Sequence, residues 1–130
     1  MRIRLLVTLM VLAALVFTVR QLVIVPDVKQ ISAAELEQLL AKGVPLQIVD
    51  VREPEEYAAG HIPGALLIPL RELEERIHEL CSQIDTVVVC LTGNRSAQAT
   101  RRLIEESFCA KNLKGGMVHW KGEVERLSAD

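Results

Sequence analysis

Short apolar runs that end in polar residues alternate with helix-like segments along this chain, and this alternation is the strongest constraint on its fold. Residues 46–49 lead into Asp50, and residues 87–89 lead into Cys90. Such runs are typical of strands that are buried on both faces of a parallel sheet. Strands that alternate with helices predict an α/β domain whose mainly parallel central sheet has helices on both faces. Ligands bind such sheets beyond the carboxyl ends of the strands, where Asp50 and Cys90 are both expected.

Capping residues and helix-breaking residues set the bounds of the other expected elements. Ser32 and Glu35 form a capping box, which predicts a helix that Gly43 closes. Pro54 and Gly60 bound a short helix at residues 53–59. The further expected elements are a strand at residues 65–68, an amphipathic helix opened by Pro69, a strand at residues 86–90, and helices at residues 96–106 and around residues 119–127.

Residues 1–26 are interpreted as an N-terminal hydrophobic anchor or signal segment, and residues 27–130 as a single domain. Arg2 and Arg4 precede an apolar stretch, and no cleavage site of the Ala-x-Ala kind is evident behind it. An uncleaved apolar helix that contacts the membrane through residues 5–25 is therefore favoured over a cleaved signal peptide.

The basic residues indicate which side of the membrane the domain occupies. Those at the extreme N-terminus favour a cytoplasmic amino end, which places the domain outside the cytoplasm, in the periplasm. Arg20, expected at the membrane interface, and Lys29 weaken this charge asymmetry. A domain on the cytoplasmic side therefore stays open as the alternative.

The domain is acidic, which bears on its partners. All 17 acidic residues but only 12 of the 15 basic residues follow Pro26, so that region has a formal charge of −5. The chain also has only two Phe, one Tyr and one Trp. An acidic domain with few aromatic residues is a poor binder of nucleic acid, so nucleic acid is excluded as a partner.

Cys90 is expected between a buried strand and a helix that begins near Ser96. A strand-to-helix turn collects backbone N–H groups and the positive end of the helix dipole. A thiol in that position ionises more readily than a free cysteine, whose pKa is about 8.5. The sequence therefore predicts an anion-binding loop with a sulfur nucleophile at its base. The residues expected to bind the substrate are Leu91, Thr92, Gly93, Asn94, Arg95 and Ser96.

Three ordered segments resemble the rhodanese (sulfurtransferase) family. Residues 50–65 resemble the family's first signature, and residues 90–96 resemble its active-site loop, C-x-x-G-x-R-S. The Leu-Lys-Gly-Gly of residues 113–116, followed by Trp120, is similar to the closing element of the family. The resemblance spans residues 31–127 and implies a single-domain, three-layer rhodanese-like fold behind the apolar N-terminal helix.

The resemblance also implies a sulfurtransferase. Cys90 would accept a sulfane sulfur as a persulfide, from thiosulfate or from a protein persulfide, and would pass it to a thiophilic acceptor. Backbone N–H groups of the loop would stabilise the thiolate and the persulfide. Gly93 would let the backbone bend inward, and Arg95 would hold an oxyanion or tighten the loop. No cofactor is expected, and no metal either, because no Cys/His cluster has zinc-like spacing.

Two other functions compete with this interpretation. One is a sulfur-carrier or partner-binding module with little turnover. Leu91 and Thr92 are uncharged, whereas a basic residue there would favour the thiosulfate dianion, so the loop indicates sulfur transfer in general rather than thiosulfate as the donor. The other is a Cys-dependent phosphatase or arsenate reductase. Phosphatases of this type use a Cys-x5-Arg loop, whereas four residues separate Cys90 from Arg95, and a shorter loop suits sulfur better than phosphate.

Other polar residues near the expected site are interpreted as structural. Asp50 and Arg52 are expected to tie a loop to the fold by an ion pair rather than to act in catalysis. His61 beside a turn is expected to pack or to cap. Cys81 and Cys109 are expected to be small buried or half-buried residues, with a Cys81–Cys109 disulfide as the alternative in an extracytoplasmic domain.

Overall fold

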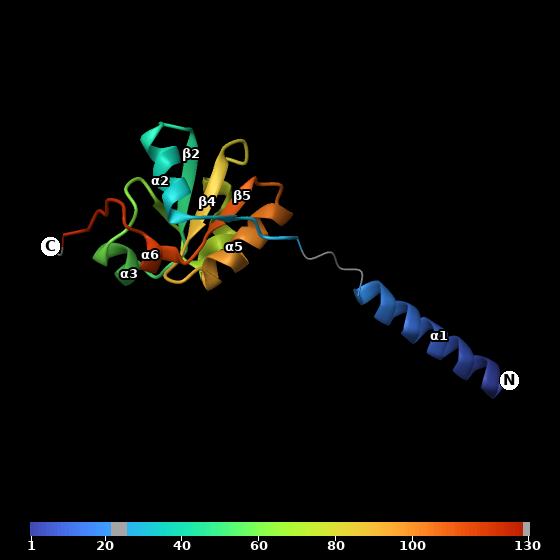
Figure 1. The fold of residues 1–130 in the computed structure, drawn as a ribbon. Helices are drawn as coiled ribbons and strands as arrows, with labels where there is room; N and C mark the ends of the chain where they lie inside the picture. The colour runs from blue at the N-terminus through green and yellow to red at the C-terminus, as the bar shows by residue number, and fades with distance from the viewer. Residues whose placement is uncertain (22–25, 129–130) are drawn as a thin grey trace.

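Five parallel strands form one sheet in the part of the chain that the computed structural model describes, residues 1–21 and 26–128 (Figure 1). The strand order is β1-β5-β4-β2-β3, and each neighbouring pair is parallel. The predicted α/β fold with a parallel sheet is confirmed. The strands are β1 (Gln30–Ile31), β2 (Leu46–Asp50), β3 (Leu66–Leu67), β4 (Asp85–Val89) and β5 (Ala110–Leu113).

Helices cover both faces of this sheet. Val88 of β4 packs in one buried cluster with Leu103, whereas the neighbouring Val89 packs in a second cluster with Leu36. Because successive side chains of a strand point to opposite faces, the two clusters are the two sides of the sheet. The helices of the domain are α2 (Ala33–Ala41), α3 (Pro54–Ala59), α4 (Leu73–Arg76), α5 (Asn94–Glu105) and α6 (Gly116–His119).

Local sequence signals placed several of these elements correctly. The Ser32 hydroxyl accepts from the backbone N–H of Glu35 at 3.2 Å, and the Glu35 carboxylate accepts from the backbone N–H of Ser32 at 2.8 Å, so the capping box is formed. Pro54 is the first residue of α3, as expected. Helix α5 begins at Asn94, two residues earlier than expected. Strand β1 was not expected, because two residues with one polar side chain give no apolar run.

The amphipathic helix expected after Pro69 is broken into three short pieces. A 3₁₀ turn at Leu70–Glu72 precedes α4, and a second at Ile77–Glu79 follows it. Leu73 is fully enclosed in the core, and Leu70 and Ile77 pack against the same cluster. The segment follows the surface of the core instead of a straight helix axis, so tertiary packing overrides the helical periodicity.

The prediction of a helix around residues 119–127 is wrong. α6 ends at His119, and the chain then runs extended, with an antiparallel bridge between His61 and Glu125. The bridge is held by two backbone hydrogen bonds of 2.9 Å. Gly122 explains part of the failure, because it disfavours helix and lies against the Trp120 ring, where an added Cβ would be 2.5 Å from the indole.

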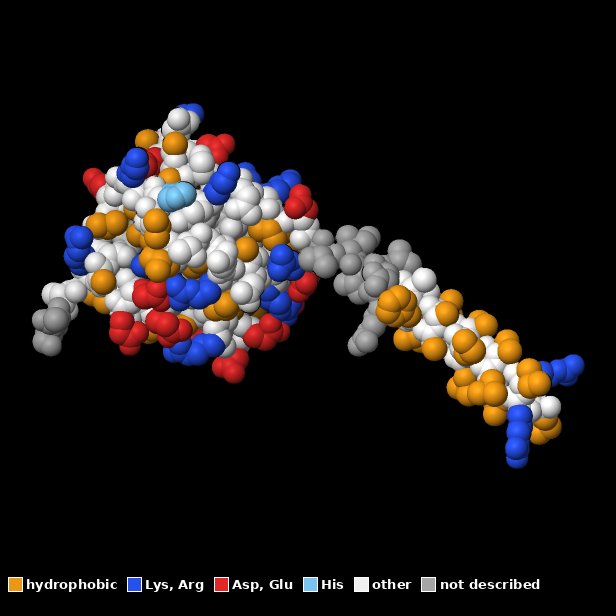
Figure 2. Space-filling model, turned by 60° about the horizontal axis from the view of Figure 1, so that its bottom comes forward, with side chains coloured by type: hydrophobic (Ala, Val, Ile, Leu, Met, Phe, Trp, Pro, Cys, Tyr) orange, Lys and Arg blue, Asp and Glu red, His pale blue; other side chains and the backbone are white. Residues whose placement is uncertain are grey.

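The N-terminal segment forms a separate helix, α1 (Arg2–Gln21). Its residues Arg2–Val19 are long and apolar enough to cross a membrane, by length and composition alone, and the rest of the chain does not bury them. A signal sequence would have the same character. Figure 2 shows hydrophobic side chains along α1, in contrast to the mixed charges of the domain. Residues 22–25 of the expected anchor and the side chain of Arg20 lie outside the described structure.

Candidate active site

The loop after β4 lies at the end of the sheet where α3, α6 and the start of α5 meet (Figure 1). Helix α6 is joined to this loop by backbone hydrogen bonds. Met117 N–H donates to the carbonyl of Cys90 at 2.9 Å, and Val118 N–H donates to the carbonyl of Leu91 at 3.0 Å. Gly116 is required there, because an added Cβ would lie 2.4 Å from the Cys90 carbonyl oxygen at a φ of +57°. The beginning of α6 therefore supports the loop from one side.

The sulfur of Cys90 lies at the base of this loop and is fully buried. The backbone N–H of Gly93 donates to Sγ at 3.1 Å, and the Ser96 hydroxyl is also 3.1 Å from Sγ. Burial raises the pKa of the Cys90 thiol, but hydrogen bonds from the Ser96 side chain and from backbone N–H groups of Ser96, Gly93 and Thr92 outweigh it and lower the pKa. The arrangement favours a thiolate.

Gly93 gives the loop its shape. Its φ of +103° is in the left-handed region, which side chains other than glycine rarely adopt. This conformation turns the Gly93 N–H toward the sulfur and starts α5 at the next residue. The beginning of α5 then lies beside the sulfur, where its dipole favours negative charge.

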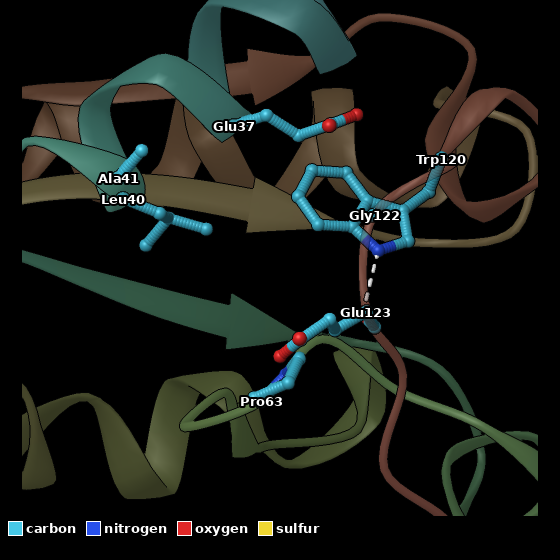
Figure 3. A pocket seen from close by; sticks show the side chains of 7 residues that line it. All are labelled: Glu37, Leu40, Ala41, Pro63, Trp120, Gly122 and Glu123. Carbon is cyan, nitrogen blue, oxygen red and sulfur yellow. Dashed lines mark hydrogen bonds between the residues drawn. The ribbon is translucent and has the colours of Figure 1, made fainter.

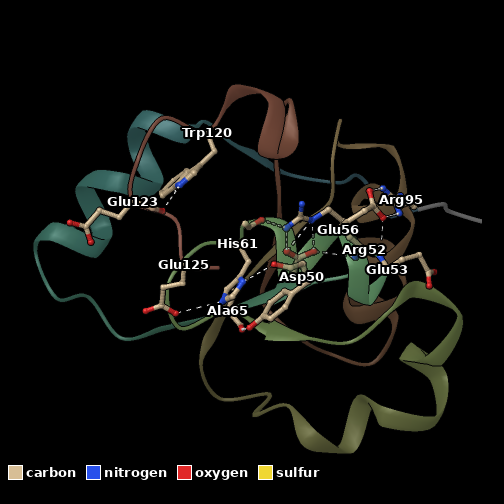
Figure 4. A network of polar contacts seen from close by, with 12 residues as sticks. Asp50, Arg52, Glu53, Glu56, His61, Ala65, Arg95, Trp120, Glu123 and Glu125 are labelled. Atoms are coloured by element: carbon tan, nitrogen blue, oxygen red, sulfur yellow. Dashed lines mark hydrogen bonds and ion pairs between the residues drawn. The ribbon is translucent and has the colours of Figure 1, made fainter. Parts of the chain in front are cut away.

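Arg95 is held by a carboxylate that sequence reasoning missed. Its two terminal nitrogens donate to the two oxygens of Glu56 on α3, each at 2.8 Å (Figure 4). Both side chains are half-buried, and the hydrogen bonds from Arg95 outweigh desolvation and lower the pKa of Glu56 to about 2. Glu56 also accepts from the backbone N–H of Glu53 at 3.0 Å. That capping pair around Pro54 was the available sequence signal, but it does not reveal the partner on α5.

Asp50 and Arg52 form a buried ion pair, with 2.7 Å between the Arg52 Nη2 and the Asp50 Oδ2. Arg52 also donates to the carbonyl of Gly60 at 2.8 Å, so the pair ties the end of β2 to the end of α3 (Figure 4). Both side chains are at least 95% enclosed and are fully engaged with each other and with the backbone. Their geometry is that of a scaffold beneath the loop.

His61 follows α3 in the chain and contacts it. Its Nδ1 is 2.8 Å from the carbonyl of Tyr57, which can only accept, so Nδ1 carries a proton. Its ring stacks on the Tyr57 ring with 3.6 Å between the centroids. Its Nε2 is 3.5 Å from the Glu125 carboxylate (Figure 4). These contacts join the C-terminal segment to α3. His61 is not among the residues that donate hydrogen bonds to the Cys90 sulfur.

Asn112 is the second polar residue that sequence reasoning missed. It lies on β5 and is 3% exposed, and its side chain contacts Ser96, Gly93 and Gln30. An asparagine inside an otherwise buried strand was the signal, because a buried amide requires partners. The partners of Asn112 are set by the packing of β5 beside the loop, and a local sequence pattern does not reveal that packing.

Cys81 and Cys109 lie far along the strands from Cys90. Their carbonyls accept from the backbone N–H groups of Ile84 and Thr86, at the amino end of β4. Both are free thiols and exposed, so the expectation that they are buried or half-buried is wrong. Cys81 precedes β4 and Cys109 precedes β5, so both lie at the amino ends of strands rather than in the core. A hydrogen bond with Asp85 raises the pKa of Cys109.

A groove of about 470 Å³ lies away from the loop, between α2 and the C-terminal segment (Figure 3). The indole of Trp120 forms one wall, and its Nε1 donates to the carbonyl of Glu123 at 2.9 Å. Residues of the Cys90 loop do not line this groove. Within residues 1–21 and 26–128, no group of three or more His, Cys, Asp or Glu side chains is arranged to hold a metal ion.

Comparisons with known proteins agree on one family. The sequence profile of the Rhodanese-like domain matches residues 32–123. The chain is 35% identical over 99 residues to the putative sulfurtransferase YtwF of Bacillus subtilis, which covers 76% of this chain and 96% of that protein. The chain is also 37% identical over 100 residues to the putative sulfur carrier protein YrkF of the same organism. This match covers 76% of the chain and 54% of YrkF. A crystal structure of a rhodanese-like domain protein from Staphylococcus aureus matches with a TM-score of 0.72 at 38% identity, over 77% of this chain and 99% of that one.

Proposed function

Because the chain belongs to the rhodanese-like domain family, we propose that it is a sulfurtransferase that accepts a sulfane sulfur on Cys90 as a persulfide and passes it to a thiophilic acceptor. The observation that carries the proposal is the position of the Cys90 sulfur, 3.1 Å from both the Gly93 N–H and the Ser96 hydroxyl at the start of α5. Those donors lower the pKa of the thiol, and a thiolate is the nucleophile that sulfur transfer needs.

In the first half-reaction, the Cys90 thiolate attacks the outer sulfur of the donor. A bond forms between Sγ and that sulfur while the donor's own bond to it breaks, and the electron pair leaves with sulfite from thiosulfate or with a thiolate from a persulfide. The negative charge then lies on the outer sulfur of the Cys90 persulfide. Backbone N–H groups of the loop face this charge and stabilise it.

In the second half-reaction, a nucleophilic acceptor attacks the outer sulfur. Its bond to that sulfur forms while the sulfur–sulfur bond to Cys90 breaks, and Cys90 leaves as a thiolate. The same donors that lower the pKa of Cys90 make it a good leaving group. One cradle therefore serves both steps, and no group outside the loop has to change its protonation state.

The choice of donor depends on Arg95. Its charge is compensated by Glu56, and its neighbours Leu91 and Thr92 are uncharged. A small dianion such as thiosulfate gains little from a loop whose nearest cation is already paired. This pairing favours a persulfide donor, and it also supports the second candidate, a sulfur-carrier module that is loaded but turns over slowly on thiosulfate.

Loading and turnover of the full chain test these two candidates. After incubation with thiosulfate or glutathione persulfide, the protein should hold sulfur that cyanide releases as thiocyanate. Cys90→Ser should abolish this sulfur, and Cys81→Ser and Cys109→Ser, which change exposed thiols, should each keep most of it. Stoichiometric loading with negligible turnover would select the carrier. Sulfur acceptance by Cys90→Ser at the wild-type rate would show that the mechanism is wrong.

Hydrolysis of p-nitrophenyl phosphate distinguishes the phosphatase alternative. Four residues separate Cys90 from Arg95, and the Arg95 guanidinium is engaged by Glu56 instead of facing an open phosphate site. We expect no hydrolysis above the level of Cys90→Ser. Appreciable turnover that depends on Cys90 would replace sulfur transfer with phosphoryl transfer as the function.

We also propose that α1 anchors the domain to a membrane, with the domain on the periplasmic side. The length and apolar composition of Arg2–Val19 support this proposal, as do Arg2 and Arg4 at the amino end. Reporter fusions at the C-terminus, one active only in the periplasm and one only in the cytoplasm, test the side. N-terminal sequencing of the mature protein separates an intact anchor from a cleaved signal.

A further inference from the structure

The side-chain amide of Asn112 has only one orientation that fits its neighbours. Its Nδ2 lies 3.1 Å from the carbonyl oxygen of Gly93, and its Oδ1 lies 2.5 Å from the Ser96 hydroxyl. A carbonyl can only accept, so the NH₂ group must face Gly93. The reversed amide would place two oxygens 3.1 Å apart in the interior. The Asn112 oxygen therefore faces Ser96 and accepts its proton.

The Ser96 hydroxyl has one proton and two neighbours that compete for it. On its other side the Cys90 sulfur is 3.1 Å away. While the proton points to Asn112, the Ser96 oxygen presents only lone pairs to the sulfur. A Cys90 thiol can then donate its S–H to Ser96, but a thiolate finds no donor there. Ser96 is fully buried and Asn112 is 3% exposed, so both groups are confined to these partners.

We infer that Asn112 is a positioning residue that competes with the Cys90 sulfur for the hydroxyl proton of Ser96. When Cys90 ionises, the hydroxyl must turn from Asn112 to the sulfur. The amide oxygen is then left without its hydrogen bond in the interior, which is costly. Asn112 therefore opposes the thiolate and favours states in which Sγ is neutral.

The Cys90 persulfide is one such state, and this consequence rests on the proposed function. In the persulfide the negative charge lies on the outer sulfur, which faces the backbone N–H groups of the loop. Sγ no longer needs the Ser96 proton, and the hydroxyl can return to Asn112. The Asn112–Ser96 pair thus favours the loaded enzyme over the free thiolate, while the net effect of all donors still lowers the pKa of the thiol.

The remaining charged groups near the loop are unchanged in the variants used to test this. They come from every element packed against the loop: Asp50 at the end of β2, Arg52 after β2, Glu56 of α3, Arg95 of α5, Lys114 after β5 and His119 of α6.

The test measures the ionisation of Cys90 in the full chain with Cys81→Ser and Cys109→Ser, so that Cys90 is the one reactive thiol. The rate of alkylation by iodoacetamide is followed against pH. Asn112→Leu removes the competing acceptor at similar size, so the midpoint should move to lower pH. Well below the midpoint, alkylation should be about fivefold faster, the size of one neutral hydrogen bond. Asn112→Ala has the same expected result and serves if the leucine variant does not fold.

Two controls separate proton competition from a merely structural role. Gln30→Ala removes the other side-chain partner of the Asn112 amide but not the contact with Ser96, so the midpoint should stay where it is. Ser96→Ala removes the shared hydroxyl and should raise the midpoint. Adding Asn112→Leu to Ser96→Ala should then change nothing, because the effect passes through that hydroxyl.

A structural role makes the opposite prediction. If Asn112 only ties down the loop, its replacement should leave the midpoint unchanged or raise it, with or without the Ser96 hydroxyl. Either result, or an equal shift in both backgrounds, overturns the inference. Alkylation uses no sulfur donor, so the result does not depend on whether Cys90 transfers sulfur.

Discussion

At the scale of single residues, the site is organised by pairs that join different elements. Glu56 on α3 holds Arg95 on α5, and Asn112 on β5 holds Ser96 on the same helix. Cys90 lies between these contacts, so the loop is fixed from two sides before any substrate binds. The backbone N–H groups of a loop held in this way stabilise charge without moving, and only the hydroxyl of Ser96 has to turn.

The Glu56–Arg95 pair should stabilise the fold in a pH-dependent way. A carboxyl whose pKa is lower in the folded state stabilises the fold above its unfolded pKa, and this stability is lost as pH falls through the folded value. For Glu56 the pKa is 4.5 in the unfolded state and about 2 in the folded state. Glu56→Gln should therefore lower the free energy of unfolding by about 1 kcal/mol at pH 7. The difference from wild type should shrink between about pH 4.5 and pH 2.

Glu55→Gln is the matched control, because Glu55 carries the same charge in the same first turn of α3 and is exposed. We expect it to change stability by less than about 0.5 kcal/mol at any pH. Urea unfolding at a series of pH values measures both variants. Equal losses for the two glutamates, or a Glu56→Gln deficit that persists unchanged at pH 2.5, would contradict a stabilising ion pair.

Sequence alone identified the residues whose neighbours are close in the chain. Cys90 and its loop were proposed as the site, and the Asp50–Arg52 ion pair was predicted, because each is defined within a few positions. Glu56 and Asn112 were missed, because their partners lie 39 and 16 residues away. A pattern within one segment reports that a buried polar group needs a partner, but the packing of the elements selects that partner.

At the scale of elements, α6 and the Cys90 loop approach each other closely at Gly116. Gly116 has a φ of +57°, and an added Cβ would lie 2.4 Å from the carbonyl oxygen of Cys90. Gly43, after α2, has a similar φ of +66° but nothing within 4 Å of an added Cβ. Replacing each glycine by alanine therefore distinguishes two contributions to the loss of stability: backbone strain, which both positions share, and the close contact, which only Gly116 has.

Gly116→Ala should destabilise the domain by about 3 kcal/mol, from strain at positive φ together with overpacking against the loop. Gly43→Ala has only the strain and should cost about 1 kcal/mol. Chemical denaturation gives both values. Gly116→Ala should also slow sulfur loading of Cys90, whereas Gly43→Ala should not. Similar costs for the two variants would mean that α6 yields without strain and does not hold the loop.

The errors at this scale have a common physical cause. The segment after Pro69 and the segment after His119 both have helical signals, yet one is broken into short turns and the other is extended. In each, contacts with the rest of the domain outweigh local preference: Leu73 reaches the core, and Glu125 pairs with His61. Strands β2 and β4 were predicted correctly because their apolar runs are buried on both faces of the sheet, whatever the details of packing.

At the scale of the whole molecule, the core of the fold and the apolar helix α1 are separate in the structure. Both core clusters are made of residues from Ile31 onward, and residues Arg2–Val19 are not buried by the rest of the chain. The alignment with YtwF of Bacillus subtilis has 99 residues and covers 96% of that protein. This length corresponds to the domain without α1. Among the residues that the structure describes, none of α1 belongs to either core cluster.

Residues 27–130 expressed alone should therefore fold with the stability of the full chain. We expect the free energies of unfolding to agree within about 0.5 kcal/mol, because removing α1 exposes no part of either core cluster. Urea unfolding, followed by circular dichroism, should be measured for both chains in the same mild detergent, so that differences in solvent do not enter. A loss above about 1 kcal/mol, or a loss of the cooperative transition, would show that α1 packs on the domain. Equal stability would mean that α1 contributes nothing to how the thiol of Cys90 is held.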